Sequence, residues 1–115
     1  MKKHVLYMLT PWTEANGQGP FYCPDCGVVE GFLAYSPEVR NHIEIIHLAY
    51  PRPRPLVVAA LGAENQGCPV LVLGEGSTLP ETAKKSFSTN RFFLDDAIGI
   101  CDFLGNLYKT IRPHP

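Results

Sequence analysis

The sequence lacks two features that would place it in a broad functional class. It has no basic stripe, because ten basic and eleven acidic residues are spread through the chain and give a net charge of −1. Its few aromatic residues do not alternate with lysine or arginine, so nucleic-acid binding has no support. It also has no long apolar run, since the first one, Val5 to Leu9, is ended by Thr10 and Pro11.

That run is too short for a membrane-directing segment. A secretory signal needs about 7–15 apolar residues and a small-residue cleavage site, and a membrane-spanning helix needs about 20. We therefore expect a cytoplasmic protein with no membrane partner. Thiols stay reduced in the cytoplasm unless they cycle, so a close cysteine pair there is more typical of catalysis or metal binding than of a structural disulfide.

The 115 residues, 45% of them apolar, fit a single domain over residues 1–115 with one modest core. Their pattern predicts β-α-β-α-β-β-α, an α/β fold whose four-stranded mixed sheet is flanked by helices. The expected strands are 4–9, 43–48, 68–74 and 91–94, the expected helices are 24–35, one that starts at Pro55, and 95–109, and the polar segment 75–90 is an excursion or a mobile loop. In the last helix we expect Asp95 to be the N-cap and an apolar stripe formed by Ile98, Cys101, Leu104 and Tyr108.

The segment "FYCPDC" (21–26) carries the chemistry that the sequence can suggest. A cysteine just before a helix, here Cys23, can point its sulfur at free backbone N–H groups, which favour the nucleophilic thiolate. Cys26 lies one turn further and can attack a mixed disulfide on Cys23, releasing the reduced substrate. Pro24 suits the first helical turn. These residues predict a dithiol mechanism, in which Cys23 attacks and Cys26 resolves.

Three neighbours of the pair modify this expectation. Asp25 opposes ionisation of Cys23, and no cationic residue lies nearby in the sequence to compensate, so we expect a less acidic thiol and a more reducing pair. Trp12 and Tyr22 flank the pair and can form an apolar rim for a protein or peptide substrate. Both aromatic residues can equally be part of the core or of loop packing.

Three stretches, "CPDC", "CPVLVL" and "FFLDDAIGICDFL", stand in an order that resembles the thioredoxin and glutaredoxin superfamily. The last two are also similar to the N-terminal domain of glutathione transferases. Together with "VEG", "RPRP" and the "RPHP" tail, they most closely resemble a small bacterial thioredoxin-like family of unknown function. The resemblance implies a thioredoxin-like fold and implies that Pro69 is the cis-proline that faces the cysteine pair.

If Pro69 takes that position, Cys68 lies against Cys23 and Cys26, and three interpretations of it stay open. It can be a second resolving thiol, or a ligand, with Cys23 and Cys26, for zinc or an iron–sulfur cluster. It can also be a small buried hydrophobic residue. Zinc typically takes four ligands, so the fourth would have to come from a distant histidine or from a partner. Cys101, on the apolar stripe, is expected to belong to the core.

The resemblance also implies a place for glutathione, whose cysteinyl backbone would pair with Cys68. Asp95 and Asp96 match the position that meets its γ-glutamyl group, which agrees with the binding of a carboxylate at a helix N-terminus and of an ammonium by an aspartate. The simpler interpretation is that the two aspartates cap and begin the last helix. Lys84 and Lys85 can offer an anion site, although a solvated face fits them better.

Two functions follow from these residues. The first is a thiol–disulfide oxidoreductase that acts on a disulfide-bearing protein or on glutathione, with glutathione as a candidate co-substrate and no bound cofactor. The second is a non-enzymatic binding or adaptor module, which would use the same groove for a partner and the cysteines for a metal.

Overall fold

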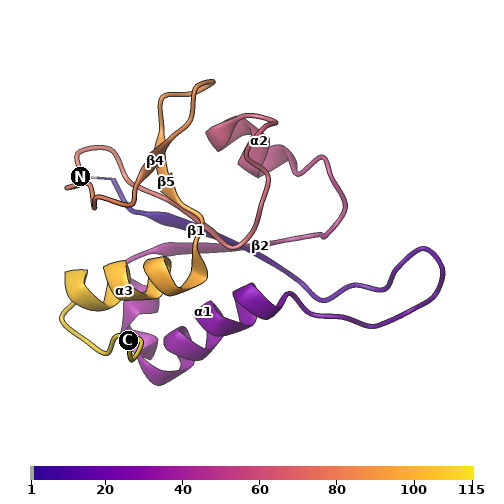
Figure 1. The fold of residues 1–115 in the computed structure, drawn as a ribbon, viewed down its shortest axis with the longest axis horizontal. Coiled ribbons are helices and arrows are strands. Elements are labelled where there is room, and N and C mark those ends of the chain that lie inside the picture. The colour runs from indigo at the N-terminus through magenta and orange to yellow at the C-terminus, as the bar shows by residue number, and fades with distance from the viewer. Residues whose placement is uncertain (1) are drawn as a thin grey trace.

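The computed structural model describes residues 2–115 and has an α/β architecture (Figure 1). The elements follow the chain as β1 (Val5–Leu9), α1 (Pro24–Tyr35), the 3₁₀ helix η1 (Pro37–Asn41), β2 (Glu44–Leu48), α2 (Pro55–Leu61), β3 (Val70–Val72), β4 (Lys84–Lys85), β5 (Phe92–Leu94) and α3 (Ala97–Leu107). Without β4 and the 3₁₀ helix η1, this is the predicted order. Within residues 2–115, no helix is both long enough and apolar enough to cross a lipid bilayer.

The sheet has five strands in the order β2-β1-β3-β5-β4, so the expected four-stranded sheet was wrong by one strand. β1 and β2 are parallel and joined through α1, and the other neighbours are antiparallel. The added strand is the pair Lys84–Lys85, which lies within the segment expected to be an excursion and pairs with Phe92 and Phe93 at the sheet edge. Two lysines give no apolar alternation, so the sequence pattern has no feature that predicts a strand there.

Each face of the sheet carries its own hydrophobic cluster, because successive strand side chains point to opposite faces. Leu6 and Met8 of β1 point to the face that α1 and α3 cover, and Tyr7 between them points to the face that α2 covers. The same alternation places Leu71 with the first cluster and Val70 with the second. Burying one such large apolar side chain contributes about 1.5–3 kcal/mol.

The helix boundaries have local causes. In α1, Pro24 occupies the first turn, where its missing N–H costs nothing, and the helix stops before Ser36, which precedes Pro37. In α3 the expectation for the cap was wrong by one residue, because Asp96 and not Asp95 is the N-cap and accepts the Gly99 N–H at 2.7 Å.

The buried face of α3 also differs from the expected stripe. Cys101 and Leu104 are buried as expected, Tyr108 is half-buried, and Ile98 is 52% exposed. Ile100 takes the core position that was expected for Ile98. The helix begins two residues later than the pattern suggested, which is a usual error for an element boundary.

Candidate functional site

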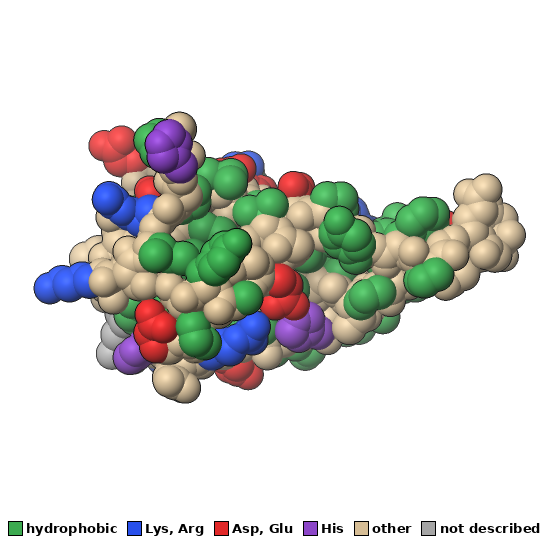
Figure 2. Space-filling model, turned by 90° about the horizontal axis from the view of Figure 1, so that it is seen from below, with side chains coloured by type: hydrophobic (Ala, Val, Ile, Leu, Met, Phe, Trp, Pro, Cys, Tyr) green, Lys and Arg blue, Asp and Glu red, His purple; other side chains and the backbone are tan. Residues whose placement is uncertain are grey.

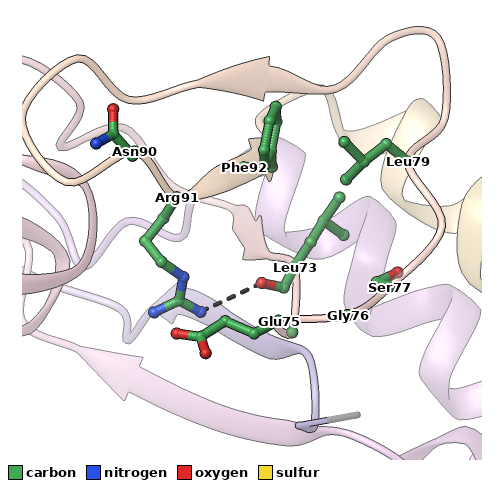
Figure 3. Close-up of a pocket in the computed structure, with 9 residues that line it drawn as sticks. Leu73, Glu75, Gly76, Ser77, Leu79, Asn90, Arg91 and Phe92 are labelled. Carbon is green, nitrogen blue, oxygen red and sulfur yellow. Dashed lines mark hydrogen bonds between the residues drawn. The ribbon is translucent and has the colours of Figure 1, made fainter.

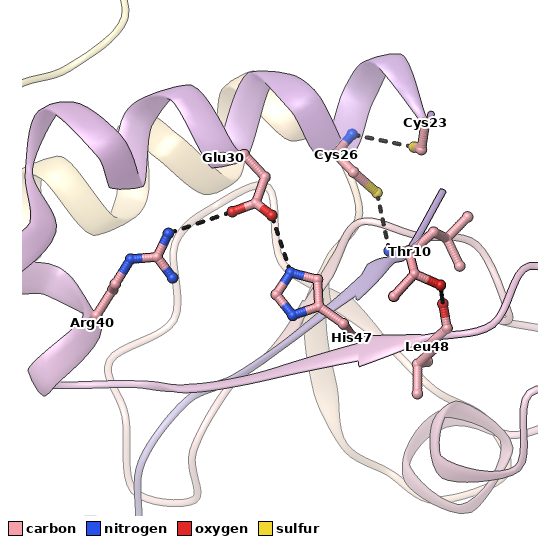
Figure 4. Close-up of polar contacts among 8 residues, drawn as sticks. Thr10, Cys23, Cys26, Glu30, Arg40, His47 and Leu48 are labelled. Atoms are coloured by element: carbon pink, nitrogen blue, oxygen red, sulfur yellow. Dashed lines mark hydrogen bonds and ion pairs between the residues drawn. The ribbon is translucent and has the colours of Figure 1, made fainter. Parts of the chain in front are cut away.

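Cys23 lies at the N-terminus of α1, where it is the N-cap residue. Its sulfur accepts a hydrogen bond from the Cys26 N–H at 3.2 Å, which satisfies one of the helix's free N–H groups (Figure 4). The side chain is half-buried, so a reagent can reach it. The structure therefore confirms that Cys23 caps a helix, and this is the position at which the helix dipole favours an anionic sulfur.

Cys26 lies one turn along the same helix and points into the protein. Its side chain is buried, and its sulfur accepts the Leu9 N–H at 3.5 Å (Figure 4). Burial and, to a smaller extent, the neighbouring Cys23 raise the pKa of the Cys26 thiol to about 12, while the Leu9 N–H acts in the opposite direction. At neutral pH this thiol is almost entirely protonated, as a resolving thiol is until it reacts.

The third sulfur comes from the loop before β3. The Cys68–Pro69 peptide bond is cis, as the resemblance implied. The Cys23 thiol donates to the backbone carbonyl oxygen of Cys68 at 3.8 Å, so the expected approach of residue 68 to the pair is confirmed. Burial raises the pKa of the half-buried Cys68 thiol, and Cys23 adds to the rise.

Arg54 is a part of this site that the sequence did not reveal. It is 5% exposed and comes from the residue just before α2. Its charge lowers the pKa of Cys68 against the larger effect of burial, and Arg52 does so more weakly. The expectation that no cation lies nearby in the sequence concerned Cys23 and Asp25, and for Cys68, which it did not cover, the fold supplies Arg54.

Several hydrogen bonds fix the Arg54 side chain. Its guanidinium donates to the carbonyl oxygens of Tyr50, at 3.0 Å and 2.5 Å, and of Gln66, at 2.7 Å, and its backbone N–H donates to the Gln66 side chain at 2.7 Å. Within residues 2–115 no carboxylate forms an ion pair with it. The only hint in the sequence is an arginine between prolines in "RPRP", which predicts a stiff connector and not a partner for Cys68.

A projecting arm joins β1 to α1 and leads into Cys23, the N-cap of α1 (Figure 1). Trp12 and Phe21 pair through two backbone hydrogen bonds, of 3.0 Å and 2.7 Å, at the base of the arm. Trp12 stacks on Tyr50 with ring centroids 4.1 Å apart, so its role is loop packing. Tyr22 is 69% exposed and remains available as an apolar rim residue, and Asp25 is also exposed.

The two aspartates before α3 have separate partners. Asp96 caps the helix, as described above, and Asp95 forms an ion pair with Lys84 at 3.1 Å. Asp95 also lines a polar cavity of about 170 Å³ together with Arg52, Gln66 and Gly67. The cavity therefore extends to the loop that carries Cys68, while Lys85 lies exposed on β4.

Further along α1, Glu30 forms an ion pair with Arg40 at 3.5 Å and a hydrogen bond with His47 at 3.0 Å (Figure 4). These side chains are 38–44% exposed, so the two contacts connect α1 to η1 and β2 but contribute little to the free energy of folding.

Over the described part of the chain, no group of three or more histidine, cysteine or acidic side chains is arranged to hold a metal ion. Cys101 is buried in the core, as expected, and burial raises its pKa to about 11.

Two apolar hollows are not lined by Cys23, Cys26 or Cys68. One, of about 250 Å³, is lined by Leu73, Leu79, Arg91 and Phe92 near the opposite end of β3 (Figure 3). The other, of about 220 Å³, lies between α1 and α3 on a face where exposed hydrophobic side chains gather, among them Val28, Tyr35 and Ile98 (Figure 2).

Comparison with known proteins identifies a family for this chain. A family described as "Protein of unknown function (DUF3088)" matches residues 3–112. The chain belongs to the DUF3088 family. It matches no curated protein and no solved structure. Membership of the DUF3088 family covers the cysteine pair, Arg54 and the cis-proline loop, and it assigns no activity to them.

Proposed function

We propose that this member of the DUF3088 family is a thiol–disulfide oxidoreductase with a thioredoxin-like fold. Cys23 attacks a substrate disulfide, and Cys26 resolves the resulting mixed disulfide. The observation that carries the proposal is the Cys23 sulfur at the N-terminus of α1, hydrogen-bonded to the Cys26 N–H at 3.2 Å and facing the Cys68 carbonyl beside the cis-proline. The order of the elements without β4 supports the thioredoxin-like fold.

The chemistry balances without a bound cofactor. The Cys23 thiolate displaces one sulfur of the substrate disulfide, which leaves as a thiolate and takes a proton. Cys26 then loses its proton and attacks the Cys23 sulfur, which releases the second substrate thiol and leaves a Cys23–Cys26 disulfide. Two electrons pass from the protein thiols to the substrate, and a reduced thiol donor must regenerate the pair.

A redox titration tests this function. The protein is equilibrated in buffers of reduced and oxidised glutathione, free thiols are alkylated, and the disulfides are located by peptide mapping. A single two-electron step that joins Cys23 to Cys26 is expected, and Cys23→Ser and Cys26→Ser should each abolish it. A wild-type protein that forms no intramolecular disulfide at any ratio would contradict the proposal.

Glutathione is the proposed small co-substrate. The supporting feature is the polar cavity beside the Cys68 loop, which is lined by Arg52 and by the carboxylates of Glu64 and Asp95, so it offers charged partners to both the carboxylates and the ammonium of glutathione. Asp95→Asn is expected to weaken binding of the thiol-blocked S-methyl glutathione in calorimetry. Asp102→Asn, which changes an exposed carboxylate of α3 outside this cavity, is the matched control, and equal weakening by the two variants would argue against the site.

The second candidate function is a binding or adaptor module, favoured by the exposed aromatic side chains of Phe21 and Tyr22 beside the pair. In this case the fold would present a surface for a partner and the thiols would not cycle. Elemental analysis of protein purified without chelators separates the two. Stoichiometric zinc or iron bound through Cys23, Cys26 and Cys68 would assign the thiols to ligation.

A further inference from the structure

Cys23 has two thiol neighbours, and their surroundings differ. Cys26 is 3% exposed, and no cationic side chain is among the groups that affect its ionisation. Cys68 is half-buried and has Arg54 beside it. A thiol reacts as its thiolate, so a neighbouring guanidinium directly increases the reactive fraction of Cys68.

The position of Cys68 also suits a bond to Cys23. The Cys23 sulfur lies 3.8 Å from the Cys68 carbonyl oxygen, which is only two covalent bonds from the Cys68 Cα. The Cys68 backbone therefore lies next to the attacked sulfur, and a disulfide between the two residues requires such an approach. The cis bond to the buried Pro69 follows directly, so the loop holds Cys68 at the site.

Arg54 is built into this loop and is not a mobile surface cation. Three guanidinium hydrogen bonds to the carbonyl oxygens of Tyr50 and Gln66 hold it, and the Gln66 carbonyl lies two residues before Cys68. Burying a guanidinium without a carboxylate is costly, and within the described chain Arg54 has no such partner. Burial keeps Cys68 a thiol at rest, and the charge of Arg54 lowers its pKa against that effect, so the cation stabilises the thiolate when it forms.

We propose that Cys68 is a second resolving cysteine, which forms a disulfide with Cys23, and that Arg54 is the positioning residue that supports its thiolate. The inference rests on the proposed function, because it needs Cys23 as the nucleophile. After Cys23 has attacked a substrate disulfide, the Cys68 thiolate attacks the Cys23 sulfur of the mixed disulfide. The Cys23–substrate bond breaks, the second substrate thiolate leaves and takes a proton, and a Cys23–Cys68 disulfide remains. The two electrons come from these two thiols.

The test isolates Cys23 and Cys68 in a Cys26→Ser, Cys101→Ala variant exposed to oxidised glutathione. Intact mass and peptide mapping are expected to give a Cys23–Cys68 disulfide, with a glutathione adduct only as a transient. If this variant accumulates the Cys23–glutathione adduct while the wild type forms Cys23–Cys26, the inference is overturned and the proposed function stands. If the wild type forms no internal disulfide either, both fail.

Arg54 is tested in the same background by the pH dependence of disulfide closure. Arg54→Gln is expected to slow closure near neutral pH and to move the profile to higher pH, since a higher pKa of Cys68 leaves less thiolate at a given pH. Arg54→Lys should restore most of the rate, which a purely structural clamp would not allow, because lysine cannot reproduce the bonds of the planar guanidinium.

Two further variants keep the outcome decisive. Arg52→Gln should give a smaller shift, in line with its weaker effect on Cys68, and Arg91→Gln, at the other end of β3, should give none. If Arg54→Gln does not fold, Arg54→Lys alone decides the matter, because loss of closure in a folded, charge-retaining variant overturns the role of the charge. An unchanged pH profile in Arg54→Gln overturns it as well.

Discussion

The two ends of β3 each hold an arginine that donates to backbone carbonyls, and they differ in what the cation faces. Arg54, near the start of the strand, is buried beside the thiol of Cys68. Arg91, near its end, donates to the Leu73 carbonyl at 3.2 Å and lines an apolar hollow (Figure 3). Arg91 lowers the pKa of Tyr7, which burial raises.

The difference shows why two arginines with similar hydrogen bonds have different effects on the reactivity of their neighbours. A phenol whose pKa lies above its ordinary value of 10.0 stays neutral at physiological pH whether or not Arg91 is present. A thiol titrates closer to neutrality and reacts through its anion, so Arg54 can change a rate. We therefore expect functional effects at the Cys68 end and effects on stability alone at the Arg91 end.

The largest expected effect belongs to the Cys68 end. Cys23→Ser should lower the rate of disulfide exchange by about a thousandfold or more, because removing an attacking nucleophile leaves only the background reaction. The assay follows the reduction of oxidised glutathione at fixed protein concentration. Arg91→Gln is the control and should keep the wild-type rate. A Cys23→Ser protein with wild-type activity would move the nucleophile to another cysteine.

The next effect is on stability, and it compares two glycines. A Cβ added at Gly74 would lie 1.8 Å from the Lys2 carbonyl oxygen, while one added at Gly67 meets nothing within 4 Å. Gly74→Ala is therefore expected to cost about 1–3 kcal/mol through overpacking, and Gly67→Ala less than about 0.5 kcal/mol. Urea unfolding measures both, and equal costs would show that the approach of residue 2 to β3 does not matter to stability.

A smaller effect separates the two aspartates before α3. Asp96→Ala removes the N-cap bond to Gly99 and is expected to cost about 1 kcal/mol. Asp95→Ala removes an ion pair whose side chains are 40% and 60% exposed, and should cost less than about 0.5 kcal/mol. Chemical unfolding of both variants measures the difference. A larger loss in Asp95→Ala would contradict the assignment of the cap.

The smallest effect is a pH dependence at the Arg91 end. His4 is buried, and its Nδ1 accepts the Gly74 N–H at 2.8 Å, so Nε2 carries the proton. Burial lowers the pKa of His4 below 6.5, so the unfolded chain binds a proton first as the pH falls. The contribution of neutral His4 to the free energy of unfolding is complete above pH 6.5 and is lost as the pH falls toward the folded pKa. The free energy of unfolding changes there by less than about 1.4 kcal/mol per pH unit.

The measurement is urea unfolding between pH 7.5 and 5, and His4→Gln is the matched control because glutamine can accept a hydrogen bond without titrating. The pH slope of the wild type should exceed that of His4→Gln. Equal slopes would mean that His4 titrates alike in the folded and unfolded states.

Sequence patterns predicted most of the fold correctly, because the patterns involved are local. The proline at the start of α1 and the apolar strands placed every element except β4, which consists of two lysines and is held only by pairing with β5. The errors in α3 were of one or two residues, since Asp95 and Asp96 are both good caps and only the observed backbone selects one.

The sequence alone determined that two thiols stand one turn apart at a helix start, because residue spacing and helix geometry suffice for that. The resemblance supplied the expectation for Pro69 and the place of Cys68. Tertiary structure alone decided that Arg54 reaches Cys68, since the two residues are 14 positions apart and meet through a loop with no periodic pattern. The charge around a thiol depends on which distant segments pack together, and the local sequence does not predict that packing.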